Sequence, residues 1–183
     1  LDEFIYLLDD ALEQLRDEGL QPLRPKIGVM VEVPASISLL QFWVGKIDFI
    51  SIGSNDLSQY LLALDRDNAR VANRFDHVHP AIINEISRIA TISSKLAIPL
   101  SVCGELASDP IAVILLIGMG VRRLSMSSSK IPRIKWLLRS ITTQQASDLL
   151  DRALALGNAS EIRQLGQAFI KTNELDQFSD GVR

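Results

Sequence analysis

Hydrophobic and polar positions follow two different patterns along this chain, and the changes between these patterns mark the expected elements. The opening stretch LDEFIYLLDDALEQLRDEG has apolar side chains three and four positions apart, which predicts an amphipathic helix that ends at Gly19. Short apolar runs without alternation come later, and such runs indicate buried strands. Strands are therefore expected within KIGVMVEVP (26–34), IDFISIGSND (47–56), IPLSVCGE (98–105) and VRRLSMS (121–127).

Helical patterns lie between and after these strands. Asp109 and Pro110 form a cap and first-turn pair, and Thr142 with Gln145 forms a capping box. The polar loop 65–79 contains both histidines, His77 and His79, which we expect to be exposed. Further helices are predicted at 35–46, 55–64, 80–97, 110–118 and 131–141, with two in the tail, opened by Thr142 and by Ser160.

Strand and helix thus alternate four times, and continuous apolar strands of this kind are covered on both faces in parallel α/β sheets. A doubly wound sheet and a TIM barrel both fit this pattern. A barrel needs eight such units and roughly 250 residues. If the fold is a barrel, the chain is therefore its C-terminal half with closing helices.

Composition narrows the classes of partner. The chain has 183 residues, is 47% hydrophobic and 22% charged, and carries a net charge of −3. It can therefore bury a hydrophobic core. It has no excess of positive charge, which argues against nucleic acid or an anionic membrane as its main partner. No apolar run is long enough to span a bilayer. A single cysteine excludes an internal disulfide and predicts a cytoplasmic protein, and a start at Leu1 inside a helix predicts a piece of something longer.

Chemically active side chains gather where the predicted strands end. Glu32 ends the first strand, Asn55 and Asp56 follow the second, and Cys103 ends the third. Active sites of parallel α/β folds gather at this edge. Two carboxylates with open positions suit Mg²⁺, although strand-end acids also pair with loops or helix N-termini. A lone cysteine is commonly a small core residue, so Cys103 could be either a buried packing residue or a reactive thiol.

Arg66 lies about ten residues after Asp56, in LDRDN. A guanidinium there could hold a phosphate through two parallel hydrogen bonds. A surface ion pair with Asp65 or Asp67 explains the same residue equally well.

Four motifs together resemble one family. VMVEVPAS, DFISIGSNDLSQYLLALDRDNARVAN, VCGELASDP and GMGVRRLSMSSSKIPRIKWLL are similar, in order and spacing, to the C-terminal half of the phosphoenolpyruvate-binding barrel of enzyme I, the phosphotransferase of the bacterial phosphotransferase system. The resemblance runs from about Lys26 to Ile170 and places all of 1–183 in a partial barrel domain. The stretch LDRDNARVANRFDHVHP is most similar to the nitrogen-related branch rather than the sugar-transport branch.

The resemblance implies a role for each residue. Glu32 and Asp56 would bind Mg²⁺. The backbone at Asn55 and the side chain of Arg66 would hold the phosphate of phosphoenolpyruvate. Cys103 would protonate the enolate carbon as pyruvate forms, which suits a thiol because it is largely protonated at neutral pH.

The implied reaction moves a phosphoryl group from phosphoenolpyruvate to a histidine of an N-terminal domain and then to a histidine phosphocarrier protein. Neither that domain nor the first half of the barrel is recognisable here, so the chain alone is expected to be inactive, with phosphoenolpyruvate binding weak or absent. Unpaired strand edges favour association, and members of the family dimerise through this domain. Both points predict a homodimer.

Three other interpretations of the function remain open. Pyruvate phosphate dikinase and phosphoenolpyruvate synthase share the Glu, Asn-Asp and Cys-Gly blocks. A Mg²⁺-dependent lyase acting on pyruvate enolate would also use two strand-end acids, but it has no need for the Cys-Gly-Glu block. A dimerisation or regulatory module could keep the motifs as framework.

Overall fold

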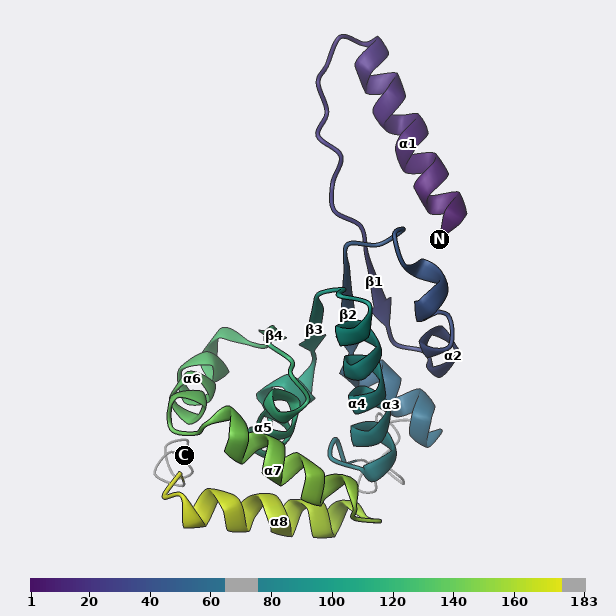
Figure 1. Cartoon of the computed structure of the whole chain (residues 1–183). Coiled ribbons are helices and arrows are strands. Elements are labelled where there is room, and N and C mark those ends of the chain that lie inside the picture. The colour runs from purple at the N-terminus through teal and green to yellow at the C-terminus, as the bar shows by residue number, and fades with distance from the viewer. Residues whose placement is uncertain (65–75, 176–183) are drawn as a thin grey trace.

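The computed structural model describes residues 1–64 and 76–175, which form an α/β fold (Figure 1). In this part of the chain four parallel strands form one sheet in the order β1-β2-β3-β4. The predicted alternation is confirmed, and the consecutive βα units match half of a TIM barrel. The strands are β1 (Gly28–Val31), β2 (Phe49–Gly53), β3 (Leu100–Cys103) and β4 (Leu124–Ser125). The α-helices are α1 (Asp2–Asp17), α2 (Pro34–Ile37), α3 (Ser54–Leu62), α4 (Pro80–Lys95), α5 (Pro110–Gly118), α6 (Ile131–Arg139), α7 (Thr143–Leu154) and α8 (Ala159–Thr172), and 3₁₀ turns are η1 (Leu40–Trp43), η3 (Glu105–Ser108) and η4 (Ser128–Lys130).

Side-chain caps explain where several helices begin. The Asp109 carboxylate accepts hydrogen bonds from two amides in the first turn of α5, and Thr142 with Gln145 closes the predicted capping box of α7. The prediction for α8 was wrong in its first residue. Asn158, in extended conformation, accepts from the Glu161 amide at 2.9 Å, so Ser160 lies inside the helix instead of capping it.

The helix predicted over 35–46 was wrong as a continuous element. The segment forms α2 and then η1, and Gly45 with φ +76° follows. Its buried side chains are Ile37 and Leu40, whose spacing of three positions fits short, tightly wound turns. Pro34 starts α2, where the missing amide proton costs nothing.

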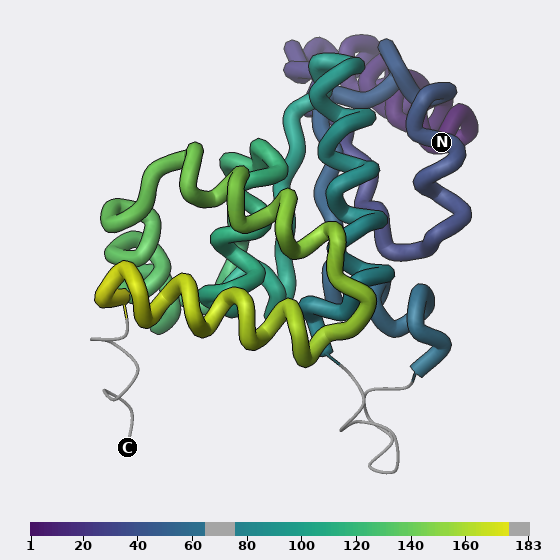
Figure 2. The backbone as a smooth tube through the Cα atoms, turned by 60° about the horizontal axis from the view of Figure 1, so that its bottom comes forward, coloured from purple at the N-terminus to yellow at the C-terminus, as the bar shows by residue number. Residues whose placement is uncertain are grey.

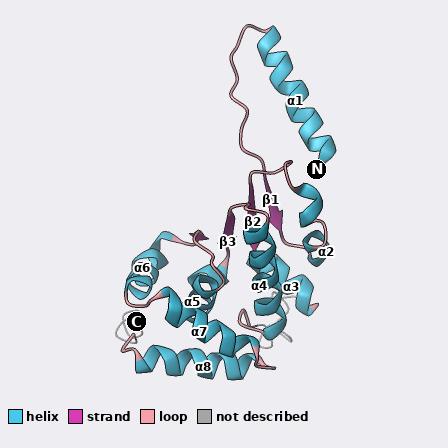
Figure 3. Ribbon diagram, in the orientation of Figure 1, coloured by secondary structure: helices cyan, strands magenta, loops and turns pink. Residues whose placement is uncertain are grey.

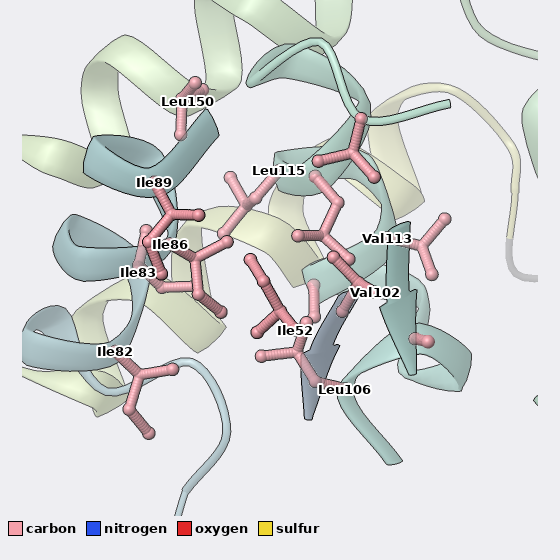
Figure 4. Close-up of a cluster of buried hydrophobic side chains, with 14 of the residues drawn as sticks. Ile52, Ile82, Ile83, Ile86, Ile89, Val102, Leu106, Val113, Leu115 and Leu150 are labelled. Atoms are coloured by element: carbon pink, nitrogen blue, oxygen red, sulfur yellow. The ribbon is translucent and has the colours of Figure 1, made fainter. Parts of the chain in front are cut away.

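The two faces of the sheet differ in what covers them. Ile50 of β2 is fully buried in the core. Ile52 of β2 and Val102 of β3 are buried with it, in the cluster that Figure 4 shows beside α4 and α5. Side chains of a strand alternate between faces, so Met30 and Ser101 lie on the opposite side. Met30 is 53% exposed, and we call this side the open face of the sheet.

The C-terminal helices form a second layer. Figure 2 shows α7 and α8 running alongside each other next to α5, and Figure 3 shows this part of the molecule to be almost entirely helical. These helices can pack so closely because two of the contact positions are glycines, which have no Cβ atom. A Cβ on Gly118 would lie 2.5 Å from the main-chain oxygen of Ala146 in α7, and one on Gly166 would lie 2.4 Å from Ile111 in α5.

Helix α1 lies apart from these layers, at the top of Figure 1. Leu12 is buried, but Phe4 and Leu7 on the predicted apolar face are each 56% exposed. An ion pair joins Asp2 to Lys46 at 2.6 Å. Across residues 1–64 and 76–175, every helix is too short or too polar to cross a bilayer.

Candidate active site at the carboxyl edge of the sheet

The register of the sheet places the predicted residues in one row. Gly53 pairs with Cys103, and Cys103 pairs with Ser125. Val31 pairs with Ile52, so Glu32 directly follows the last paired position of β1 and adjoins Gly53. The carboxyl ends of all four strands therefore meet at the same edge. By alternation, Glu32 and Cys103 belong to the open face, two positions beyond Met30 and Ser101.

Glu32 reaches across the end of β2. A Cβ built on Gly53 would lie 2.6 Å from both Cγ and Oε1 of Glu32, so the glutamate side chain occupies the space that any other residue at position 53 would fill. Glu32 is half-buried. The absence of a side chain at Gly53 thus allows the carboxylate to lie over the strand that leads to Asp56.

The first turn of α3 is tied to the end of β3. Ser54 is fully buried, and its hydroxyl donates to the main-chain carbonyl of Cys103 at 2.6 Å. The Asn55 side-chain oxygen accepts from the Glu105 amide at 3.0 Å. Asp56, in the same turn, is exposed. The positive end of the helix dipole and free first-turn amides therefore face the edge where these carboxylates lie.

Cys103 is half-buried and thus reaches the surface of the edge. Its thiol donates to the main-chain oxygen of Ile52, with 3.4 Å between the sulfur and the oxygen. A thiol is a weak hydrogen-bond donor, so this hydrogen bond can be exchanged for one to another acceptor at small cost.

The histidines are not exposed loop residues, and that prediction was wrong. The His77 side chain is 15% exposed, and its Nε2 lies 3.0 Å from a carboxylate oxygen of Glu105. His79 accepts from the Ala81 amide through Nδ1 at 3.2 Å and caps α4. His77 is therefore held by its contact with Glu105, and His79 by its place as the cap of α4.

A second cluster, which the sequence patterns missed, lies around Arg163. Arg163 of α8 donates to both carboxylate oxygens of Asp76, at 2.7 to 3.2 Å, and to Asp109 at 2.5 Å. Asp109 also caps α5. Arg163 thus joins the segment before α4, the start of α5 and the C-terminal helix layer. Arg163 and Asp76 lie 87 positions apart in the sequence, so no local pattern could have paired them.

Comparison with known proteins agrees with this geometry. Residues 1–143 match the model of the family described as PEP-utilising enzyme, PEP-binding domain. The chain belongs to this family. The match includes α1, which lies before the first residue of the resemblance seen in the motifs.

The chain also resembles curated proteins with related names. It is 45% identical over 172 residues to a Salmonella typhimurium protein named phosphoenolpyruvate-dependent phosphotransferase system, and 41% identical to one of that name in Escherichia coli. It is 40% identical over 171 residues to the phosphoenolpyruvate-protein phosphotransferase of Haemophilus influenzae. Each alignment covers 93% of this chain, but only 23%, 23% and 30% of the relatives. The chain thus spans less than a third of the relatives' length.

The structure brings most of the predicted site together. Glu32, Asn55, Asp56 and Cys103 lie on the carboxyl edge of the sheet. Arg66 lies outside the described residues. Among residues 1–64 and 76–175, no three histidine, cysteine, aspartate or glutamate side chains are grouped as in a metal site made by protein alone. Any ion at this edge would therefore need substrate or water oxygens as well.

The cluster around Arg163 leads to a prediction about the stability of the fold in acid. Burial works to raise the pKa of Asp76, but hydrogen bonds from Arg163 and the Val78 amide outweigh it, and the pKa falls below its ordinary value. Burial likewise opposes the charge of Arg163, while Asp76 and Asp109 raise its pKa above the ordinary value. A carboxyl with a depressed folded pKa stabilises the fold above its unfolded pKa and loses that contribution as the pH falls through the folded one.

We therefore expect the Asp76 contribution to be nearly complete above about pH 5 and to disappear progressively below about pH 4. Asp76→Asn should lower the free energy of unfolding at neutral pH and weaken its decline in acid. Urea unfolding at a series of pH values measures both effects, with Asp151→Asn, an exposed aspartate of α7, as control. Identical pH profiles for Asp76→Asn and the unmodified chain would contradict the assignment.

Proposed function

We propose that this chain is the part of a phosphoenolpyruvate–protein phosphotransferase that binds phosphoenolpyruvate and releases pyruvate, and that residues 1–183 belong to one partial barrel domain. The observation that carries the proposal is the shared register of Glu32, Gly53 and Cys103 at the carboxyl edge, next to the first turn of α3. Family membership and the relatives' names support the same chemistry.

Glu32 and Asp56 would hold a magnesium ion. The chemistry of the donors fits, because carboxylate oxygens are hard ligands and Mg²⁺ keeps several waters instead of needing a full protein cage. The space above Gly53, which a Cβ would close, gives the Glu32 carboxylate its place beside the start of α3. When bound, the ion supplies positive charge that neutralises phosphate oxygens.

The phosphate would lie at the start of α3. Amides in the first turn there, including that of Asn55, are available to an anion because the Gly53 cap provides no side-chain hydrogen bond. The Asn55 side chain is already engaged by the Glu105 amide, so its backbone is the group that can reach the substrate. The Arg66 guanidinium would complete the phosphate contacts.

Cys103 would supply the proton that completes pyruvate. When the phosphoryl group leaves, the enolate electrons form a bond from the methylene carbon to the thiol proton, the S–H bond breaks, and Cys103 is left as a thiolate. Its half-buried position on the open face supports this role. The phosphoryl group would pass to a histidine of an N-terminal domain and then to a histidine phosphocarrier protein, as the resemblance implies.

We also propose that the protein is cytoplasmic and forms a homodimer. The single cysteine supports a reducing, cytoplasmic setting. Strands β1 and β4 are the edges of the described sheet, and unpaired edges favour association, which supports a homodimer.

Titration with Mn²⁺, which substitutes for Mg²⁺ and is visible by electron paramagnetic resonance, tests the metal proposal directly. Glu32→Gln should weaken Mn²⁺ binding at least tenfold, because it removes one of the two charged ligands. Glu105→Gln removes the same charge from the same edge outside the proposed ligand pair, and we expect it to leave binding nearly unchanged. Equal losses in the two variants would show only a general attraction of cations to an acidic edge, and would refute the assigned ligands.

A further inference from the structure

A cleft of about 390 Å³ lies between α6, α8 and the start of α5, away from the carboxylates and thiol of the edge. Helix α8 contributes Arg163, Gln167, Ile170 and Lys171, whose spacing places them along one side of the helix. Helix α6 contributes Arg133, Trp136 and Leu137. The volume falls within the range of roughly 300–1,000 Å³ typical of small-molecule sites.

The walls of the cleft are held in place by packing and by charge. Gly166 lets α8 approach Ile111 of α5 so closely that a Cβ would lie 2.4 Å from it. Arg163 fixes the same helix to Asp76 and Asp109. The cleft is therefore formed before any ligand arrives, which lowers the cost of binding.

The charges within the cleft favour an anion. The carboxylate of Asp109 is paired with Arg163. In the part of the chain that the structure describes, neither Arg133 nor Lys171 forms an ion pair, and both are exposed. The first amides of α5 are already bonded to Asp109, so an anion here would be held by side chains and not by the helix terminus.

The apolar surfaces define the other half of the ligand. Trp136 is half-buried, and Leu137, Ile111 and Ile170 add aliphatic surface around it. An indole face packs well against a flat ring, and cations at the rim would hold a charged group attached to that ring. The lining thus matches an amphiphilic ligand better than a compact polar one.

We propose that this cleft is a binding site for a small organic anion with a flat apolar body, of the aromatic carboxylate class. Trp136 and its aliphatic neighbours bind the ring, and Arg133 with Lys171 binds the carboxylate. The site is separate from the proposed phosphoenolpyruvate site, since none of Glu32, Asp56 or Cys103 lines it.

Calorimetry on the whole chain with phenylacetate and its uncharged counterpart phenylacetamide tests the proposal. We expect phenylacetate to bind with a dissociation constant of about 1 mM or lower, and the amide at least tenfold more weakly. The double variant Arg133→Gln/Lys171→Gln should lose at least tenfold in phenylacetate affinity. Lys135→Gln, which removes a charge from α6 outside the cleft, should keep it.

The indole N–H signal of Trp136 in a nitrogen–proton NMR spectrum locates the binding. Trp43→Phe identifies that signal because it leaves one tryptophan. A shift that saturates with phenylacetate supports the proposal. Equal affinity for acid and amide, no binding, or binding only after removal of residues 176–183 overturns it, the last because the cleft would then serve this chain's own tail.

Discussion

Cys103→Ala is expected to lower pyruvate formation by about 10²-fold or more, the usual contribution of a positioned acid. The reason is that the methylene carbon of enolpyruvate must gain a proton, and the thiol is the proton donor proposed at the open face of β3. A suitable assay uses a chimera in which this chain replaces the matching segment of the Haemophilus influenzae relative, to which it is 40% identical. Pyruvate release from phosphoenolpyruvate is then followed with a coupled dehydrogenase.

The structure supplies a matched control for this loss. Ser101 lies on the same strand and face two positions earlier, and Ser101→Ala removes a hydroxyl that donates to the Ile50 carbonyl at 3.3 Å. We expect that variant to keep most of its turnover. Mn²⁺ binding by Cys103→Ala should be unchanged, since the thiol is not a proposed ligand. Full turnover in the chimera with Cys103→Ala would mean that the cysteine is only a packing residue.

Gly104→Ala should destabilise the fold by about 2–4 kcal/mol and disorganise the proposed phosphate site. Gly104 has φ +103° and ψ −170°, a conformation that side chains strongly disfavour. A Cβ there would lie 2.4 Å from the Ser54 hydroxyl and 2.8 Å from the Asn55 side-chain oxygen. Those two groups form the hydrogen bonds that attach α3 to the end of β3.

Urea unfolding measures the stability change, and Gly120→Ala separates its two causes. Gly120 also has a positive φ, +88°, but a Cβ there would meet nothing within 4 Å. Gly120→Ala should therefore show the backbone cost alone, about 1 kcal/mol. If both variants lose the same stability, the contact between Gly104 and the first turn of α3 contributes nothing.

The positions of the strands and of their polar ends could be predicted because the signals are local. The run VMV is continuous and apolar, ISI has one serine between its isoleucines, and Glu32, Asn55 and Cys103 stand where such runs stop. Caps are local too, which explains why Asp109 and Thr142 were assigned correctly. Ser160 was wrong because Asn158, two positions earlier, offers an equally good acceptor, and only backbone conformation decides between them.

The sequence by itself determined the α/β alternation, the order of the reactive side chains and the family, since each depends on neighbours in the chain. Only the tertiary structure decided that Glu32 crosses Gly53, that His77 meets Glu105 and that Arg163 joins two aspartates far from it in sequence. These contacts form when helices pack on the sheet, and packing is set by shape and charge across the whole molecule. The spacing of hydrophobic residues specifies which face of a helix or strand is buried. It does not specify which side chain from a distant part of the chain will pack against that face.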